Sequence, residues 1–150
     1  EEELSKRIIG LAIKVHTTLG PGFLEKVYEN ALCHELEINN LQYEQQKEIS
    51  VLYDNYEVGY YIADIVVENK IILELKAVKE IDNIHKAQLM NYLKATNYKA
   101  GYVINFASYP KLEFYRMVTW LLSTEISETT EFEKRNAKFN NHKKTCYFSI

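Results

Sequence analysis

The sequence predicts an α/β (α+β) domain built around a mixed β-sheet that is flanked by helices. Three observations predict it: two segments with helical spacing open the chain, three β-rich segments follow, and a further helical segment precedes another strand. Because that last strand follows a crossover helix, it can lie parallel to one of the earlier strands. The expected element order is α-α-β-β-β-α-β, followed by a C-terminal extension.

Two helices are expected at the start of the chain. Between Leu4 and Leu19, apolar residues recur at the spacing of a helix face, and Gly20-Pro21-Gly22 should end that helix. A second helix is expected over residues 24–38 and should be closed by Asn39-Asn40. We expect the Gly-Pro-Gly bend to turn Glu25 toward the sheet.

Strands are expected at 43–53, 57–67 and 71–78, because these segments are rich in β-forming residues and are separated by turn residues. Asp82 or Asn83 can cap a helix over residues 84–96, and another strand is expected at 99–106. Residues 112–122 are apolar and ambiguous, and we expect a strand there that becomes helical near Trp120.

Three charged residues, Asp64, Glu74 and Lys76, interrupt the apolar runs on either side of the turn at residues 68–70. Runs this apolar are typical of strands that are buried on both faces. An ionised group in such a strand costs several kcal/mol unless it is paired or bound to a metal. We therefore interpret the three charges as a functional site.

The hairpin register brings these charges together. If residues 68–70 form the loop, Asp64 falls directly opposite Glu74, with Cβ atoms about 5 Å apart. Lys76 lies two residues beyond Glu74 and shares its face. Two facing carboxylates repel each other, and a hard cation such as Mg2+, which prefers carboxylate oxygens and water, relieves that repulsion.

The motifs around these residues resemble a known family. Asp64, followed by Glu74-Leu75-Lys76, resembles the D…(D/E)-x-K core of the PD-(D/E)XK nuclease superfamily. Residues 22–28 match the G-x-x-E-x-x-Y string of its small GxxExxY family, and residues 15–16, 19–22 and 85–93 are also similar to it. The resemblance spans roughly residues 4–120 and implies a restriction-endonuclease-like core. Ala63 stands where the superfamily name has proline, a position that carries no ligand.

The resemblance implies a metal-dependent nuclease that uses Mg2+, for which Mn2+ can substitute. Asp64 and Glu74 would be metal ligands, together with the backbone carbonyl of Leu75; the alternative is a structural ion-pair cluster with Lys76. Lys76 would orient or help deprotonate the attacking water, and it would stabilise the negative charge that develops on phosphorus. Neutralising the two acids is a compatible role for the same ammonium.

Two helical residues are added by the resemblance. Glu25 would point into the site as a further metal ligand, although a solvated surface position is the usual fate of glutamate. Gln88 and Tyr92 lie four residues apart on one helix face. Gln88 would approach the site or the substrate phosphate, whereas the ring of Tyr92 also suits core packing.

His16 and His85 are weaker candidates for contacts around the site or with phosphate, because a lone histidine is more often structural. Tyr28 is expected to anchor its helix, with its hydroxyl bonded to a buried polar partner.

Composition indicates one nuclease-like domain over residues 1–122 and an extension over 123–150 that has a basic tail and either packs on the same domain or is disordered.

Cys33 and Cys146 lack C-x-x-C spacing, so neither zinc nor redox chemistry is indicated. With two cysteines and no recognisable signal peptide, we expect a cytoplasmic protein. No apolar run approaches the ~20 residues that a membrane span needs, so no membrane partner is expected.

Charge bears on the expected partner, a nucleic acid, with DNA favoured over RNA. The net charge is −3, with a balance of −8 in residues 1–75 and +5 in residues 76–150. This asymmetry can mark a surface that faces nucleic acid, or it can vanish where the two halves interleave in space. A homodimer is compatible with the sequence, which does not fix the oligomeric state.

Two other functions remain open at this point. The chain can be a catalytically inactive module that binds nucleic acid or a protein partner and retains the nuclease fold. It can also be a structural protein in which the charged cluster is a buried ion-pair network.

Overall fold

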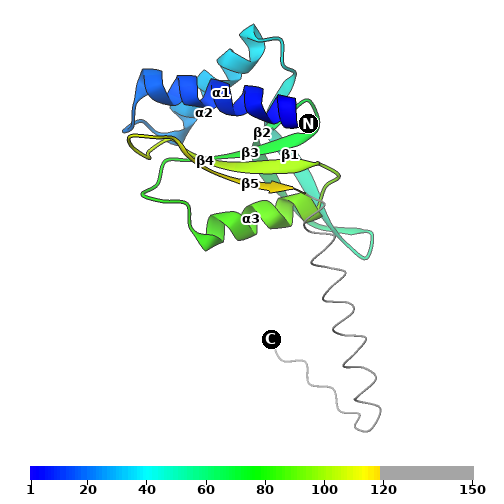
Figure 1. Ribbon diagram of the computed structural model, residues 1–150. Coiled ribbons are helices and arrows are strands. Elements are labelled where there is room, and N and C mark those ends of the chain that lie inside the picture. The colour runs from blue at the N-terminus through cyan, green and yellow to red at the C-terminus, as the bar shows by residue number, and fades with distance from the viewer. Residues whose placement is uncertain (119–150) are drawn as a thin grey trace. The chain divides into compact units, whose positions relative to one another are not determined.

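The computed structural model describes residues 1–118 and confirms the predicted class, since a five-stranded mixed sheet carries helices on both faces (Figure 1). The elements, in chain order, are α1 (Glu2–Leu19), α2 (Glu25–Ile38), β1 (Tyr43–Tyr53), β2 (Tyr56–Val67), β3 (Ile71–Lys76), α3 (Asn83–Lys94), β4 (Ala100–Asn105) and β5 (Glu113–Val118).

The strands lie side by side in the order β1-β2-β3-β4-β5. β3 and β4 are parallel, as the crossover through α3 predicts, and every other neighbouring pair is antiparallel. Both central strands are almost entirely buried, so their continuous apolar runs pack against helices on both faces.

Helices α1 and α2 cover one face of the sheet, and α3 covers the other (Figure 1). The main core lies beneath α1 and α2, where Tyr28 stacks on Phe106 with 4.8 Å between ring centroids. On the opposite face, a Cβ at Gly101 would lie 2.4 Å from Leu89, so this glycine lets α3 approach the sheet closely.

Several boundaries differ from those expected. The third strand ends at Lys76 because the side chain of Asn105 binds both backbone groups of Val78, at 3.1 and 2.9 Å. Helix α3 ends at Lys94, two residues early, and the Thr96 hydroxyl donates to the carbonyl of Tyr92.

β5 matches the strand expected after residue 112 and adds a fifth strand to the sheet. The helical turn expected near Trp120 and the extension over 123–150 lie outside the described residues.

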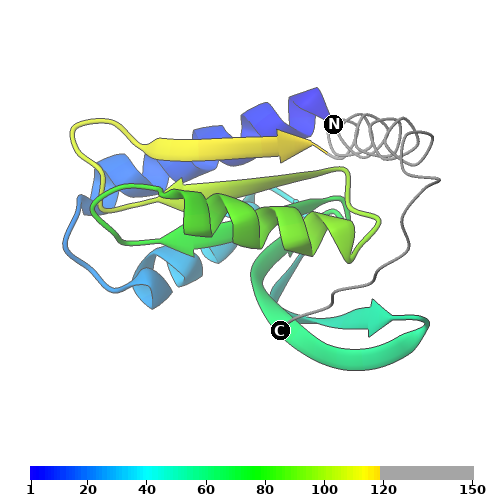
Figure 2. The same cartoon turned by 90° about the horizontal axis from the view of Figure 1, so that it is seen from below.

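The β1–β2 hairpin extends beyond the body of the sheet and curves away from it (Figure 2). Gln46 in β1 has φ of +53°, and a β-bulge lies between Val51 and Leu52. Both features bend a strand. The far end of this hairpin exposes several large apolar side chains: Leu52, Tyr53, Tyr56, Val58 and Tyr60.

Candidate active site

The charged hairpin has the predicted register. Val67 pairs with Ile71, and the regular ladder between β2 and β3 ends at Ile65–Leu73. The next pair would join Asp64 and Glu74. Instead, Oδ2 of Asp64 accepts a 2.7 Å hydrogen bond from the backbone N–H of Leu75, so the side chain of Asp64 takes the place of a ladder partner.

Glu74 is the most strongly perturbed acid of the described residues. Only 4% of the residue is exposed, and its Oε1 is buried with no hydrogen-bond partner within residues 1–118. The pKa of Glu74 is raised to about 8, mainly by burial and then by the charge of Asp64; Lys76 opposes both effects, and Glu25 adds a smaller increase. An unsatisfied carboxylate oxygen in such surroundings is suited to bind a cation.

Asp64 and Lys76 complete the hairpin cluster. Burial raises the pKa of Asp64, and the charge of Glu29 adds to this, whereas the Leu75 N–H and the ammonium of Lys76 lower it. Lys76 is half-buried at the last position of β3, and its charge lowers the pKa of both acids. The hairpin thus holds two carboxyl groups with raised pKa values beside the ammonium group of Lys76.

Glu25 lies at the first position of α2 and is exposed, so the expected turn toward the sheet brings its charge near Glu74 without burying it. The preceding bend is tied to the helix by Tyr28, whose hydroxyl donates to the Gly20 carbonyl at 2.6 Å and accepts from the N–H of Phe23 at 3.2 Å. Within residues 1–118, no three His, Cys, Asp or Glu side chains converge closely enough to hold a metal ion.

Gln88 and Tyr92 contact each other rather than the acids. The amide of Gln88 donates to the hydroxyl of Tyr92, and the ring of Tyr92 stacks on Tyr61 with 3.6 Å between centroids. Burial raises the pKa of Tyr92, and the charge of Glu74 raises it further. This tyrosine pair therefore lies within electrostatic reach of the buried acid, on the face that α3 covers.

The hydrogen-bond partners of the two histidines are a loop carbonyl and a helix cap. Nε2 of His16 lies 2.6 Å from the carbonyl oxygen of Ser108, in the loop between β4 and β5. His85 forms a capping box with Asp82 at the start of α3, where its Nδ1 accepts from the Asp82 N–H at 3.1 Å. A sequence motif does not distinguish a capping histidine from a phosphate ligand, since both sit at a helix N-terminus.

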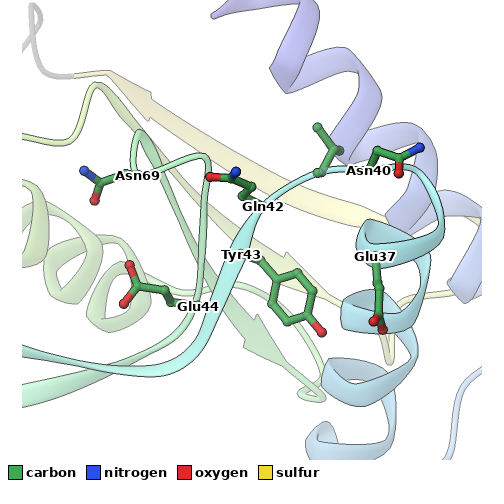
Figure 3. A pocket seen from close by; sticks show the side chains of 7 residues that line it. Glu37, Asn40, Gln42, Tyr43, Glu44 and Asn69 are labelled. Carbon is green, nitrogen blue, oxygen red and sulfur yellow. The ribbon is translucent and has the colours of Figure 1, made fainter.

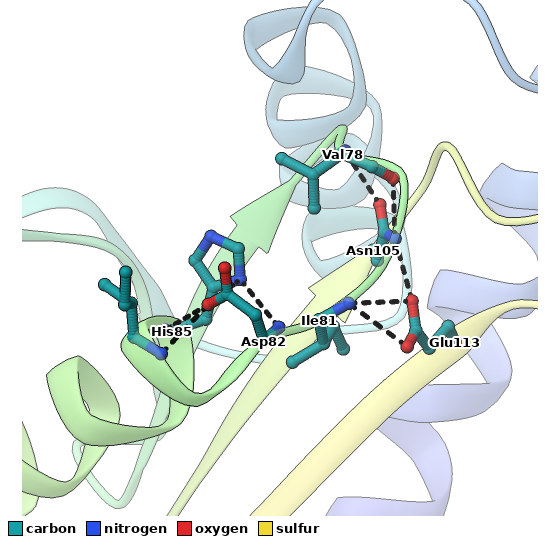
Figure 4. A network of polar contacts seen from close by, with 7 residues as sticks. Val78, Ile81, Asp82, His85, Asn105 and Glu113 are labelled. Atoms are coloured by element: carbon teal, nitrogen blue, oxygen red, sulfur yellow. Dashed lines mark hydrogen bonds and ion pairs between the residues drawn. The ribbon is translucent and has the colours of Figure 1, made fainter.

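A buried network fixes the loop that follows Lys76 (Figure 4). Asn105, which is fully buried, donates to Glu113 at 2.8 Å and binds both backbone groups of Val78. The carboxylate of Glu113 accepts from the N–H of Ile81 at 3.2 Å. Because Asn105 also pairs with Lys76 in the sheet, this network holds the backbone next to the lysine.

Sequence reasoning missed Glu29 and Gln46. Glu29 is a buried acid of α2 whose charge acts on Asp64, and Gln46 of β1 lies opposite Asp64. One signal was present: Glu29 lies four residues after Glu25 and so shares its helix face. Nothing in the sequence marks the left-handed backbone of Gln46.

One well-formed pocket lies elsewhere. It measures about 610 Å³ and is formed by the end of α2, the start of β1 and the β2–β3 turn, with Glu37, Tyr43 and Asn69 among its lining residues (Figure 3). None of the residues proposed for the site lines it. We therefore place the candidate site by its chemistry, at the point where β2 and β3 separate.

The comparison with protein families decides the assignment, because the model of the PD-(D/E)XK nuclease superfamily matches residues 2–117. The chain belongs to the PD-(D/E)XK nuclease superfamily. The five-stranded mixed sheet with flanking helices agrees with the restriction-endonuclease-like fold of that superfamily.

Other comparisons add little to this superfamily assignment. No curated protein shows a significant match. A solved structure titled "Crystal structure of SSO0001" is 20% identical, with a TM-score of 0.44, over 63% of this chain and 50% of that one. The chain thus spans about half the length of that protein, and a similarity this low carries no argument about function. No helix within residues 1–118 is both long and apolar enough to span a membrane.

Proposed function

We propose that this chain is a metal-dependent nuclease of the GxxExxY type that hydrolyses phosphodiester bonds, with DNA ahead of RNA as its substrate. One observation carries the proposal. Glu74 is buried opposite Asp64, beside Lys76, with an unsatisfied carboxylate oxygen, in a chain of the nuclease superfamily. The cost of burying that acid is easiest to explain if a cation binds there.

The residues fit a hard divalent cation such as Mg2+ or Mn2+. Asp64 and Glu74 supply carboxylate oxygens, the Leu75 carbonyl is a further candidate, and Mg2+ usually keeps several waters beside one or two carboxylates. Such a cation, when bound, polarises a phosphate oxygen and lowers the pKa of a bound water. Glu25, exposed at the start of α2, can add a ligand by a change of rotamer.

In this proposal Lys76 binds the scissile phosphate and stabilises the negative charge that develops on it. Its position supports this role, because the buried Asn105–Glu113 network fixes the backbone that follows it. Its charge also lowers the pKa of both acids and favours the ionised forms that bind a cation.

The test is cleavage of labelled single- and double-stranded DNA and RNA with Mg2+ or Mn2+, compared with EDTA. We expect metal-dependent cleavage by the wild type and a loss of at least about 100-fold in Lys76→Ala. Lys79→Ala, an exposed lysine three residues further on, is the matched control and should cleave like the wild type. An inactive wild type, or a Lys76→Ala protein that cleaves normally, would contradict the proposal.

A second candidate is a catalytically inactive module that binds nucleic acid and retains the fold. The observation in its favour is that no three ligating side chains converge within residues 1–118. The two functions differ in their need for metal. Nucleic-acid binding that is independent of metal, Asp64 and Glu74, without cleavage, would support the module.

A further inference from the structure

Glu29 is a buried acid that the proposed chemistry does not use directly. Only 4% of it is exposed, yet hydrogen bonds saturate its carboxylate: Lys26 donates at 2.8 Å, Gln45 at 2.7 Å, and Gln46 donates to both oxygens at 2.9 and 3.0 Å. Burial alone would raise the pKa of Glu29, but these hydrogen bonds outweigh it and lower the pKa below its ordinary value. Glu29 is therefore a fixed, ionised anchor.

Gln46 connects this anchor to the candidate site. The same Nε2 atom that donates to Glu29 lies 3.5 Å from Oδ1 of Asp64. Gln46 lies opposite Asp64, because Gln45 pairs with Ile65 and Lys47 with Ala63, yet no regular pair forms between them. Its left-handed backbone, with φ of +53°, is costly for a non-glycine residue in a strand and is found preferentially at functional sites.

We propose that Gln46 is a positioning residue that orients the carboxylate of Asp64, with Glu29 as its anchor. The N–H of Leu75 holds Oδ2 of Asp64 at 2.7 Å, and Gln46 restrains Oδ1 from the side of β1. The two contacts limit rotation of the carboxylate. The amide also lies between two like-charged groups, Glu29 and Asp64, and moderates their repulsion.

This inference rests on the proposed function, since orientation of Asp64 matters only if Asp64 binds a cation. Groups that orient a ligating side chain typically change metal affinity by about 10- to 100-fold when they are removed. A single contact at 3.5 Å belongs at the lower end of that range.

The chain offers a matched pair of variants for the test. Asparagine carries the same amide one methylene shorter and tolerates a left-handed backbone well, so Gln46→Asn suits the backbone of this position but loses the reach to Asp64 and to Glu29. Gln45→Asn makes the same change at the neighbouring glutamine, which donates to Glu29 and Asn30 but not to Asp64. The readouts are the Mn2+ dissociation constant from calorimetry and the midpoint of thermal unfolding.

We expect Gln46→Asn to weaken Mn2+ binding by about tenfold and Gln45→Asn to bind Mn2+ within about twofold of the wild type. Both variants lose hydrogen bonding to Glu29, so their unfolding midpoints should fall by similar amounts. If Gln46→Asn binds like the wild type, or if both variants lose affinity equally, the inference is overturned while metal binding stands. If the wild type binds no Mn2+, or Asp64→Asn binds it equally well, the proposed function fails instead. Should Gln46→Asn unfold much earlier than Gln45→Asn, Glu29→Gln, which keeps the shape of the anchor, must weaken Mn2+ binding in its place.

Discussion

The backbone N–H of Leu75 donates a 2.7 Å hydrogen bond to Oδ2 of Asp64, one residue beyond the last regular pair of β2 and β3. A side chain thus replaces a backbone partner where the two strands separate. The contact links the two parts of the proposed site, Asp64 on one strand and the Glu74-Leu75-Lys76 segment on the other.

Glu74 should make the stability of the metal-free protein depend on pH. Its folded-state pKa of about 8 lies above the ordinary value of 4.5, so its contribution is complete below pH 4.5 and is lost as the pH rises through 8. We expect the free energy of unfolding, measured by urea titration in EDTA, to fall by roughly 2–4 kcal/mol between pH 5 and pH 8.5 from this group.

Glu74→Gln is the control for this effect, because the neutral amide does not titrate. It should remove most of that fall and be more stable than the wild type at pH 8.5. Equal pH dependence in the two proteins would show that Glu74 is not the responsible group.

Asn105→Ala should destabilise the fold by about 2–4 kcal/mol, because it removes the side-chain partner of both backbone groups of Val78 and one of the two donors to the Glu113 carboxylate. Asn97→Ala, at an exposed position, should change stability by less than about 0.5 kcal/mol. Urea unfolding of both variants measures the difference. A loss below about 1 kcal/mol at Asn105 would mean that the network adds little to the fold.

Tyr92→Phe tests how the ring of Tyr92 on α3 is held against Tyr61 of β2. The substitution keeps the stack on Tyr61 and removes only the hydroxyl that accepts from Gln88. We expect a loss of no more than about 1 kcal/mol, against about 3 kcal/mol or more for Tyr92→Ala, which also removes the ring. Equal losses would assign the stability to the hydrogen bond rather than to ring packing.

Tyr28→Phe should loosen the bend before α2. The buried hydroxyl binds the backbone of Gly20 and Phe23, so its removal should cost about 1–2 kcal/mol and speed hydrogen exchange at Phe23. Tyr60→Phe, at a tyrosine that is 60% exposed, is the control and should change neither quantity. Unchanged exchange at Phe23 in Tyr28→Phe would contradict the anchoring role.

Much of the hairpin could be predicted because its determinants are local. Loop length and the alternation of side chains fix the register of β2 and β3, and that register places Asp64 opposite Glu74. The crossover helix likewise allows the strand after it to lie parallel to one of the three earlier strands, and the structure shows that this strand is β3.

The rest depends on contacts between distant segments. The side chain of Gln46 is held by Glu29, 17 residues away on another element, and no local pattern predicts this contact or the left-handed backbone of Gln46. The sequence predicts a strand that reaches Val78, but β3 ends at Lys76. The side chain of Asn105, 27 residues from Val78, forms hydrogen bonds with the N–H and the carbonyl of Val78 in place of a neighbouring strand. His85, a weaker candidate for a phosphate contact, forms a capping box with Asp82, and the sequence alone does not distinguish these two roles at a helix N-terminus.

The central claim is that Asp64 and Glu74 together hold a divalent cation. Anomalous diffraction from a crystal soaked in Mn2+ at pH 8 tests it most directly. The account predicts an anomalous peak in contact with oxygens of both Asp64 and Glu74, and its loss in Asp64→Asn. A map in which Mn2+ lies only elsewhere, with Oε1 of Glu74 still buried and unpartnered, would contradict it.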